Sequence, residues 1–338
     1  RLYDYSIKYI LMKKTFLISC LLVASFPVMA AYTGHVYVDK NKNGVFDKGE
    51  KPMSGVKVSD GLNVVETAAD GSFTLPGHAG ERFIFITTPS GYKTYNRHYH
   101  KIEDKQASYD FGLMPYDGGL GKDGSHKYIH IADTEIFNTK NHDEWVNNVR
   151  DYAANEHAAF IIHTGDICYE KGLKEHIKLM NTENMDCPVF YCIGNHDLVK
   201  GKYGEELFEN IYGPVYYSFD AGRVHYIVTP MAGGDHAPGY TREDVYLWLK
   251  NDLAHVKPGT PIMVFNHDLL TYDDAFVFKG DNGGSINLNE HNLKAWVYGH
   301  WHINYMKKQG DVYSVSTATL DKGCLLYTSP SPRDRSVS

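Results

Sequence analysis

The sequence predicts a small all-β sandwich domain followed by an α/β domain of the α+β layered kind, in which helices flank sheets. Two patterns predict this arrangement. Between residues 32 and 114, short strand patterns alternate with turns such as Asp70-Gly71, at the spacing typical of small β-sandwiches. From Lys127 onward, apolar runs typical of buried strands alternate with helical patterns. A length of 338 residues suits two domains.

The composition excludes some classes of function. The chain has 34 Lys and Arg against 41 Asp and Glu, which gives a net charge of −7 at pH 7. General nucleic-acid binding requires a basic surface, so the acidic balance argues against it and disfavours a nuclease. With 43% hydrophobic and 22% charged residues, the composition is that of a globular protein.

The two ends have the character of segments outside the fold. Met12 is followed by two lysines, an apolar run over 16–26 and a small-residue site ending at Ala30, which predicts a signal peptide over 12–30. Residues 1–11 precede this start, and we expect them to be an upstream, non-native segment. Residues 324–338 resemble translated sequencing-adapter sequence, and we expect them to be an artefactual tail. The sequence therefore predicts a secreted, periplasmic or cell-surface protein with no transmembrane helix in its mature chain.

The predicted β-domain, residues 32–114, contains a loop with the spacing of a calcium site. Oxygen-bearing residues recur between the first two strands, and Gly44 permits the sharp turn that the pattern requires. Calcium prefers six to eight oxygen ligands. The predicted ligands of a structural Ca²⁺ are Asp39, Asn41, Asn43, the carbonyl of Val45, Asp47 (directly or through water) and Glu50. The alternative is an Asn/Gly turn that binds no ion.

The predicted α/β domain, residues 118–323, carries the chemistry. Five apolar runs, at 128–132, 158–163, 189–193, 262–265 and 295–298, are predicted strands, and 241–254 is the clearest helix. Each strand is followed by residues that can bind metal. Ligands bind at the carboxyl ends of strands in α/β sheets, so this order predicts a metal site. The residues are Asp133 and Glu135, then Asp166, then Asn195, His196 and Asp197, then His267, and finally His300 and His302.

These motifs resemble the calcineurin-like metallophosphoesterase superfamily, whose order is D-x-H, G-D, G-N-H-[DE], H and G-H-x-H. The resemblance covers about 127–323. It implies a β-sandwich flanked by helices and two divalent ions, for which manganese, iron or zinc suit the ligand types. It also implies a secreted bacterial type with an N-terminal β-domain, whose C-terminal part is truncated in this sequence.

The resemblance further implies a role for each site residue. Asp166 would bridge the two metals, Asp133 and His302 would bind the first, and Asn195, His267 and His300 would bind the second. His196 would act as a general acid or bind substrate. Asp197 could orient His196 or cap a helix. A metal-bound hydroxide would attack the phosphorus of a phosphate monoester or diester in line.

One position departs from the pattern, because Glu135 stands where the family usually has His. A carboxylate there can bind a hard ion, favouring manganese or magnesium, or it can lie beside the first metal without binding it.

Two alternatives remain open at this stage. Tyr169, in the run Gly165-Asp166-Ile167-Cys168-Tyr169, also resembles the iron-binding tyrosine of purple acid phosphatases. The fold could instead serve a non-catalytic surface or binding protein. The motifs leave the oligomeric state open.

Overall fold

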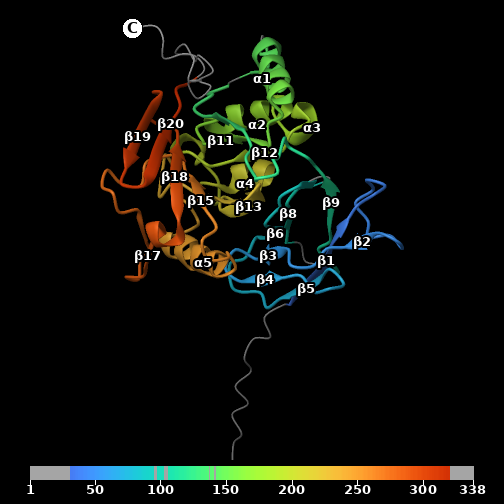
Figure 1. Ribbon diagram of the computed structural model, residues 1–338. Coiled ribbons are helices and arrows are strands. Elements are labelled where there is room, and N and C mark those ends of the chain that lie inside the picture. The colour runs from blue at the N-terminus through green and yellow to red at the C-terminus, as the bar shows by residue number, and fades with distance from the viewer. Residues whose placement is uncertain (1–30, 95–96, 103–105, 137, 141, 320–338) are drawn as a thin grey trace, which may run out of the picture.

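The computed structural model describes residues 31–94, 97–102, 106–136, 138–140 and 142–319. The predicted signal peptide and the C-terminal tail lie outside these residues. A β-domain, coloured from blue to green in Figure 1, packs against a larger domain of sheets and helices. This architecture confirms the fold class that the sequence predicts.

The N-terminal domain is a sandwich of two sheets, with strand orders β2-β1-β9-β7 (β5 also pairs with β1) and β4-β3-β6-β8. The strands are β1 Tyr32–Val38, β2 Lys51–Pro52, β3 Lys57–Ser59, β4 Val64–Glu66, β5 Ser72–Leu75, β6 Phe83–Ile86, β7 Tyr92–Thr94, β8 Tyr99–Lys101 and β9 Phe111–Pro115. Side chains alternate between the two faces of a strand, so Phe111 and Leu113 of β9 both point into the core. Val36 and Ile84 meet them there from the other strands.

The second domain contains two larger sheets. Strands β10, β11 and β12 form a parallel sheet, and the other has the order β13-β14-β15-β18-β20-β19. The strands are β10 Tyr128–Ile131, β11 Phe160–His163, β12 Val189–Tyr191, β13 Tyr217–Ala221, β14 Val224–Val228, β15 Ile262–Phe265, β18 Leu293–Tyr298, β19 Tyr305–Gln309 and β20 Val312–Ser316, with a hairpin of β16 Val277–Lys279 and β17 Ser285–Asn287. The five strands that precede the predicted ligands are therefore divided between two sheets.

Helices cover these sheets (Figure 1). They are α1 Asp143–Glu156, α2 Tyr169–Leu179, α3 Thr182–Met185, α4 Glu206–Tyr212 and α5 Arg242–Ala254, with 3₁₀ turns η1 Asn195–Asp197 and η2 Leu288–His291. Strand β11 shows how the layers pack. Ile161 joins a core with α1, while Phe160 and Ile162 point to the opposite side, where Phe160 meets Tyr226 of the other sheet with ring centroids 4.8 Å apart. Alternation along one buried strand thus produces a helix–sheet–sheet layering.

The predicted helix over 241–254 is confirmed as α5. It begins with a capping box in which Thr241 accepts a bond from the Asp244 amide and the Asp244 carboxylate accepts one from the Thr241 amide. Its Trp248 is fully buried, and its ring lies 6.4 Å from that of Phe85 in the N-terminal domain. Among the described residues, no helix combines the length and apolar character needed to cross a membrane.

The two domains share one apolar core. Phe83, Phe85 and Tyr99 of the β-domain belong to the same buried cluster as the second domain's sheets, and Thr88 forms a bridge with Phe219. The domains are thus joined by packed side chains as well as by the chain itself.

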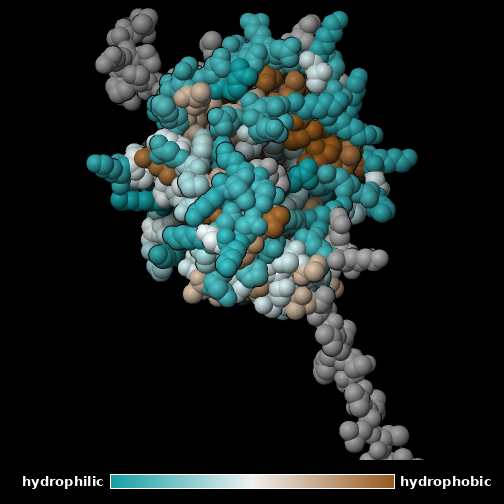
Figure 2. Space-filling model, turned by 90° about the vertical axis from the view of Figure 1, so that its right-hand side faces the viewer, coloured by the Kyte–Doolittle hydropathy of each residue, from teal (hydrophilic) through white to brown (hydrophobic). Residues whose placement is uncertain are grey.

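The surface toward the β-domain side is mostly hydrophilic, with a few apolar patches (Figure 2). Two grooves of about 980 and 920 Å³ lie between the domains. Their linings include none of the predicted ligands of the metal site. The predicted metal ligands therefore lie outside both grooves.

Candidate metal centre

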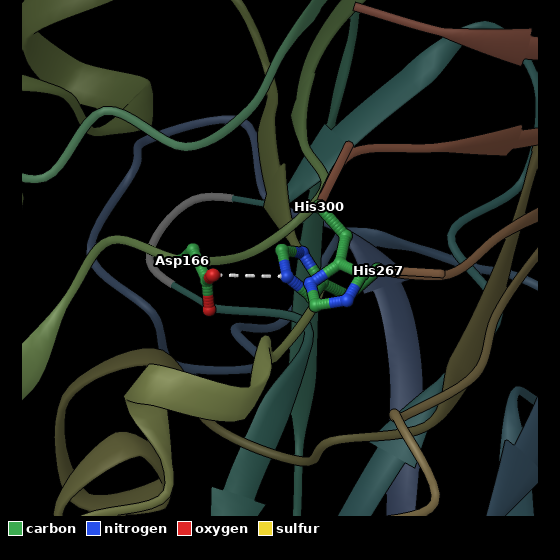
Figure 3. A group of neighbouring side chains, drawn as sticks. All are labelled: Asp166, His267 and His300. Atoms are coloured by element: carbon green, nitrogen blue, oxygen red, sulfur yellow. Dashed lines mark ion pairs between the residues drawn. The ribbon is translucent and has the colours of Figure 1, made fainter. Parts of the chain in front are cut away.

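The carboxyl ends of strands from both sheets bring the predicted ligands together. Asp166 follows β11, His267 follows β15 and His300 follows β18. Ligand atoms of these three residues lie within 4.8 Å of one another (Figure 3). His267 Nε2 lies 3.0 Å from Asp166 Oδ2. One carboxylate and two imidazoles at this separation form a metal-binding cluster.

The hydrogen bonding of His267 leaves one ring nitrogen free for a metal. Its Nδ1 lies 2.8 Å from the Thr164 carbonyl oxygen, which can only accept, so Nδ1 carries the proton. Nε2 then presents a lone pair to the Asp166 carboxylate, and no hydrogen bond satisfies it. Two electron-rich atoms 3.0 Å apart repel unless a cation or a proton lies between them. Metal-binding histidines commonly donate their other ring nitrogen to a carbonyl in this way.

A second buried atom has the same character. The side-chain oxygen of Asn195 is buried and has no hydrogen-bond partner among the described residues. A buried acceptor left unpaired costs about 1–3 kcal/mol. Metal ligation by this oxygen and by His267 Nε2 would offset that cost, so the residues present fit the metals that the motifs imply.

Asp133 and His302 form the other half of the cluster. His302 Nε2 lies 3.4 Å from Asp133 Oδ1, and the His300 amide donates to the same carboxylate at 3.1 Å. Burial raises the pKa of Asp133 to about 7, because water is excluded and Asp166 adds a second negative charge. Glu135 is partly exposed, with Oε1 3.9 Å from His302 Nε2. The structure thus places Glu135 at the edge of the Asp133–His302 pair.

Neighbouring charges also shift the pKa values of His267 and Asp166 in the other half of the cluster. Burial alone would lower the pKa of His267, but the adjoining Asp166 overrides it and raises that pKa to about 9. Burial would raise the pKa of Asp166, and His267, when it carries a proton on Nε2, reverses this and lowers it. The pair therefore favours its charged forms when a proton occupies the position that a metal would take.

The backbone at the site is unusual. Eleven non-glycine residues in the described part of the chain have positive φ, and seven belong to the loops that carry the ligands. They are Asp133, Glu135, Asp166, Cys168, Tyr169, His300 and His302. A non-glycine residue in this conformation costs about 1–3 kcal/mol and persists only where surrounding contacts hold it there. Gly194 is needed as well, since a Cβ there would overlap the Asp166 carboxylate.

The structure places His196 beside the ligands and gives it a partner that sequence reasoning missed. Its amide donates to Asp166 Oδ1 at 3.0 Å, and its Nδ1 lies 2.8 Å from Asp235 Oδ2. Burial would lower the pKa of His196, but the bond to Asp235 and the charge of Asp166 raise it. Asp235 lies in the loop after β14. The only sequence signal for it is an acidic residue after Gly233-Gly234 in a Gly-rich loop.

Asp197 contacts backbone groups and not the ring of His196. Its two oxygens accept from the amides of Cys168 and Gly194 at 2.8 and 2.9 Å, and its side chain is fully buried. The sequence suggested that Asp197 either orients His196 or caps a helix. This geometry corresponds to the second role, because Asp197 accepts from the amide that precedes η1. The bond that would orient His196 is made by Asp235. Tyr169 is 45% exposed, and its ring centroid lies 5.2 Å from that of His196.

The predicted calcium loop is a compact turn far along the chain from the metal cluster. The Asp39 carboxylate is buried and accepts from the amides of Lys42 and Gly44 at 2.7 and 2.8 Å. Asp47 Oδ2 accepts from the side-chain amides of Asn41 and Asn43, and Glu50 accepts from the amides of Lys40 and Asp47. The structure therefore gathers the predicted oxygen ligands into one turn, where they bond within the loop.

Comparison with known proteins agrees with this organisation. The family model described as calcineurin-like phosphoesterase matches residues 126–304, and the model of the N-terminal domain of calcineurin-like phosphoesterases matches 40–116. No curated protein matches the chain.

Several solved structures resemble parts of the chain. The phosphopantetheinyl hydrolase PptH of Mycobacterium tuberculosis is 12% identical over 58% of this chain and 90% of its own, with a TM-score of 0.37. A dimetal phosphatase of Danio rerio is 10% identical over 56% and 87%, with a TM-score of 0.38. A 5′-nucleotidase of Staphylococcus aureus, described as putative, is 13% identical over 57% and 48%, with a TM-score of 0.34.

Proposed function

Because this chain belongs to the calcineurin-like phosphoesterase family and is a metal-dependent phosphoesterase, we propose that it holds two divalent ions and hydrolyses phosphate monoesters or diesters. The observation that carries the proposal is a pair of buried acceptor atoms without a hydrogen bond. They are His267 Nε2, which lies 3.0 Å from the Asp166 carboxylate, and Asn195 Oδ1, whose neighbour His196 donates its amide to that carboxylate. Atoms that accept no hydrogen bond in a buried acidic cluster are suited to a metal.

The motif order of the family implies how the residues would divide between two ions. Asp166 would be shared, Asn195, His267 and His300 would hold one ion, and Asp133 and His302 would hold the other. Glu135, whose Oε1 lies 3.9 Å from His302 Nε2, would lie beside the ion held by Asp133 and His302. When bound, such ions polarise the phosphoryl group and lower the pKa of bound water to a value near neutral pH. Manganese, iron and zinc all suit carboxylate, amide and imidazole ligands.

The chain's own residues would orient the substrate and move a proton. With Nδ1 engaged by Asp235, His196 presents Nε2 as the nitrogen available to the substrate. As the bond from phosphorus to the leaving oxygen breaks, Nε2–H would give its proton to that oxygen, while water supplies the new bond to phosphorus. The proton that the water loses returns to solvent, from which His196 is reprotonated. General acid catalysis of this kind increases the reaction rate by about 10²–10⁴-fold.

A direct assay tests the proposal. We expect purified protein with manganese to hydrolyse a chromogenic phosphate monoester or diester, and His267→Ala to abolish this together with metal binding. His196→Ala should retain metal and lose more activity on esters with poor leaving groups than on those with good ones. Protein that binds two ions per chain yet hydrolyses neither ester would instead support a binding role. A purple protein would support iron ligation by Tyr169.

We also propose that loop 39–50 binds a structural Ca²⁺. The support is the calcium spacing of its oxygen-bearing residues and their convergence in one turn.

We propose in addition that the protein is exported. The support is the signal-peptide pattern over 12–30. Cell fractionation, with a variant lacking these residues as the control, tests it. Retention of the full-length protein in the cytoplasm would contradict export.

A further inference from the structure

The ring of His196 is held by a carboxylate from outside the motifs that supply the predicted ligands. Asp235 Oδ2 lies 2.8 Å from His196 Nδ1, and both side chains are partly exposed, at 39% and 34%. Asp235 follows β14, whereas His196 follows β12 in the other sheet. This contact therefore exists only because the two sheets pack together.

The loop that carries Asp235 is fitted closely to the backbone beside His196. The Asp235 amide donates to the Asn195 carbonyl at 3.0 Å. Gly234 passes so near that a Cβ on it would overlap the Asn195 carbonyl and lie 2.7 Å from its Cα. Backbone and side chain of this loop thus contact consecutive residues of η1, and the carboxylate has a defined position relative to the ring.

The other end of the loop is anchored by buried Glu205. Its carboxylate accepts from the Gly239 amide at 2.9 Å, and the Gly204 amide donates to the Ala237 carbonyl at 2.9 Å. Arg82 of the N-terminal domain donates to the Glu205 carboxylate at 2.8 Å. The β-domain therefore neutralises the charge of the residue that holds the loop.

From these contacts we propose that Asp235 is a positioning residue that keeps a proton on Nδ1 of His196 and fixes the orientation of its ring, in a loop that Glu205 and Arg82 hold in place. The proposal rests on the proposed function, in which His196 protonates the leaving group. A carboxylate accepting from Nδ1–H directs the other ring nitrogen to the substrate, as in other carboxylate–histidine pairs. The N-terminal domain then contributes to catalysis through the loop and not through contact with substrate.

Kinetics of three substitutions at one position test this role. Asp235→Asn should lower kcat by about 10- to 100-fold on an alkyl phosphate ester, which is part of the contribution of general acid catalysis. It should lower kcat by less than about threefold on a nitrophenyl ester, whose leaving group needs no proton, and leave KM unchanged. Asp235→Glu should recover part of the loss, and Asp235→Ala should resemble Asp235→Asn. His236→Ala, an exposed neighbour in the same loop, is the matched control.

A measurement without turnover separates this proposal from the proposed function. In protein labelled with ¹⁵N in the histidine rings, the His196 signal, assigned by its loss in His196→Ala, should report a proton on Nδ1. In Asp235→Ala that preference should be lost while the melting temperature stays within about 2 °C.

The outcomes are distinct. An inactive wild-type protein with the expected tautomer would overturn the phosphoesterase function and leave the positioning role supported. A wild-type His196 with its proton only on Nε2, or equal losses on both esters in Asp235→Asn, would overturn the positioning role.

Discussion

Removal of the Arg82 side chain should destabilise the protein strongly, and in a pH-dependent way. Arg82 Nη2 lies 2.8 Å from Oε1 of both Glu205 and Glu209, and its Nε donates to Glu209 at 3.0 Å. The arginine side chain is 28% exposed, and the two glutamates are buried. Arg82→Met would therefore leave two neighbouring carboxylates without their cation in the interface between the domains.

The expected loss is about 3–5 kcal/mol at pH 8, the usual cost of breaking a buried ion pair from one side. At about 2–4 °C per kcal/mol for a chain of this size class, the melting temperature should fall by about 6–20 °C. By contrast, Arg242→Met removes an ion pair with Asp281 whose side chains are both well exposed. This control should cost no more than about 1 kcal/mol.

The loss should shrink as pH falls. Burial raises the pKa of Glu209 from 4.5 to about 7, although Arg82 lowers it. Between these values the folded protein holds a proton that the unfolded chain has released, so ionisation of Glu209 costs stability as pH rises. Without Arg82 the pKa of Glu209 in the folded protein rises further, so its ionisation at pH 8 costs more folding stability. At pH 5 the carboxyl group stays protonated in the folded protein, and much of the penalty disappears.

Thermal or urea denaturation at pH 5 and pH 8 measures these differences. Arg82→Met combined with Glu205→Gln and Glu209→Gln should recover most of the stability at pH 8, because neutral amides need no cation. A loss below about 1 kcal/mol for Arg82→Met at pH 8 would refute the argument. So would a triple variant that is no more stable than the single one.

Three further predictions concern the ions. Asp166→Asn should lower activity by about 10³-fold and reduce the metal content measured by mass spectrometry, since the ions supply several kcal/mol to catalysis; full metal content would contradict a shared-ligand role. Glu135→Ala should lower activity, with partial rescue by added manganese, and unchanged activity and metal content would remove Glu135 from the site. In Asp166→Asn protein, where the metal centre is impaired, Ca²⁺ at 100 times its dissociation constant should still stabilise the fold by about 2.7 kcal/mol. Addition of Asp47→Asn to this variant should reduce the stabilisation by Ca²⁺. If Ca²⁺ shifted the melting temperature equally with and without Asp47→Asn, the result would argue against a calcium site in this loop.

Much of the site could be predicted from sequence because its residues follow strands. An apolar run indicates a buried strand, and the first polar residues after it lie at the strand's carboxyl end. This pattern predicts that Asp166, His267 and His300 lie close together, and in the structure their ligand atoms lie within 4.8 Å of one another. The helix over 241–254 was predictable for a similar reason, since periodicity and a Thr cap are local features.

Other features were beyond local reasoning. Strand periodicity does not say to which sheet a strand belongs, so the division of the ligand-bearing strands between two facing sheets came from packing. The pair of β13 and β14 was not predicted, and Asp235, in the Gly-rich loop that follows β14, was therefore not assigned to His196. The positive φ of Asp133 or His300 likewise has no sequence signal, because it is imposed by surrounding contacts.

The sequence alone determined which kinds of side chain form the metal site and in what order they occur, because each motif consists of residues adjacent in the chain. Tertiary structure decided which of two neighbouring acids serves His196. Asp197 is adjacent in sequence but turns its carboxylate to backbone amides, while Asp235, 39 positions away from the histidine, reaches the ring at 2.8 Å. The reason is physical: a hydrogen bond depends on distance and direction in space, and these are set by how the two sheets pack.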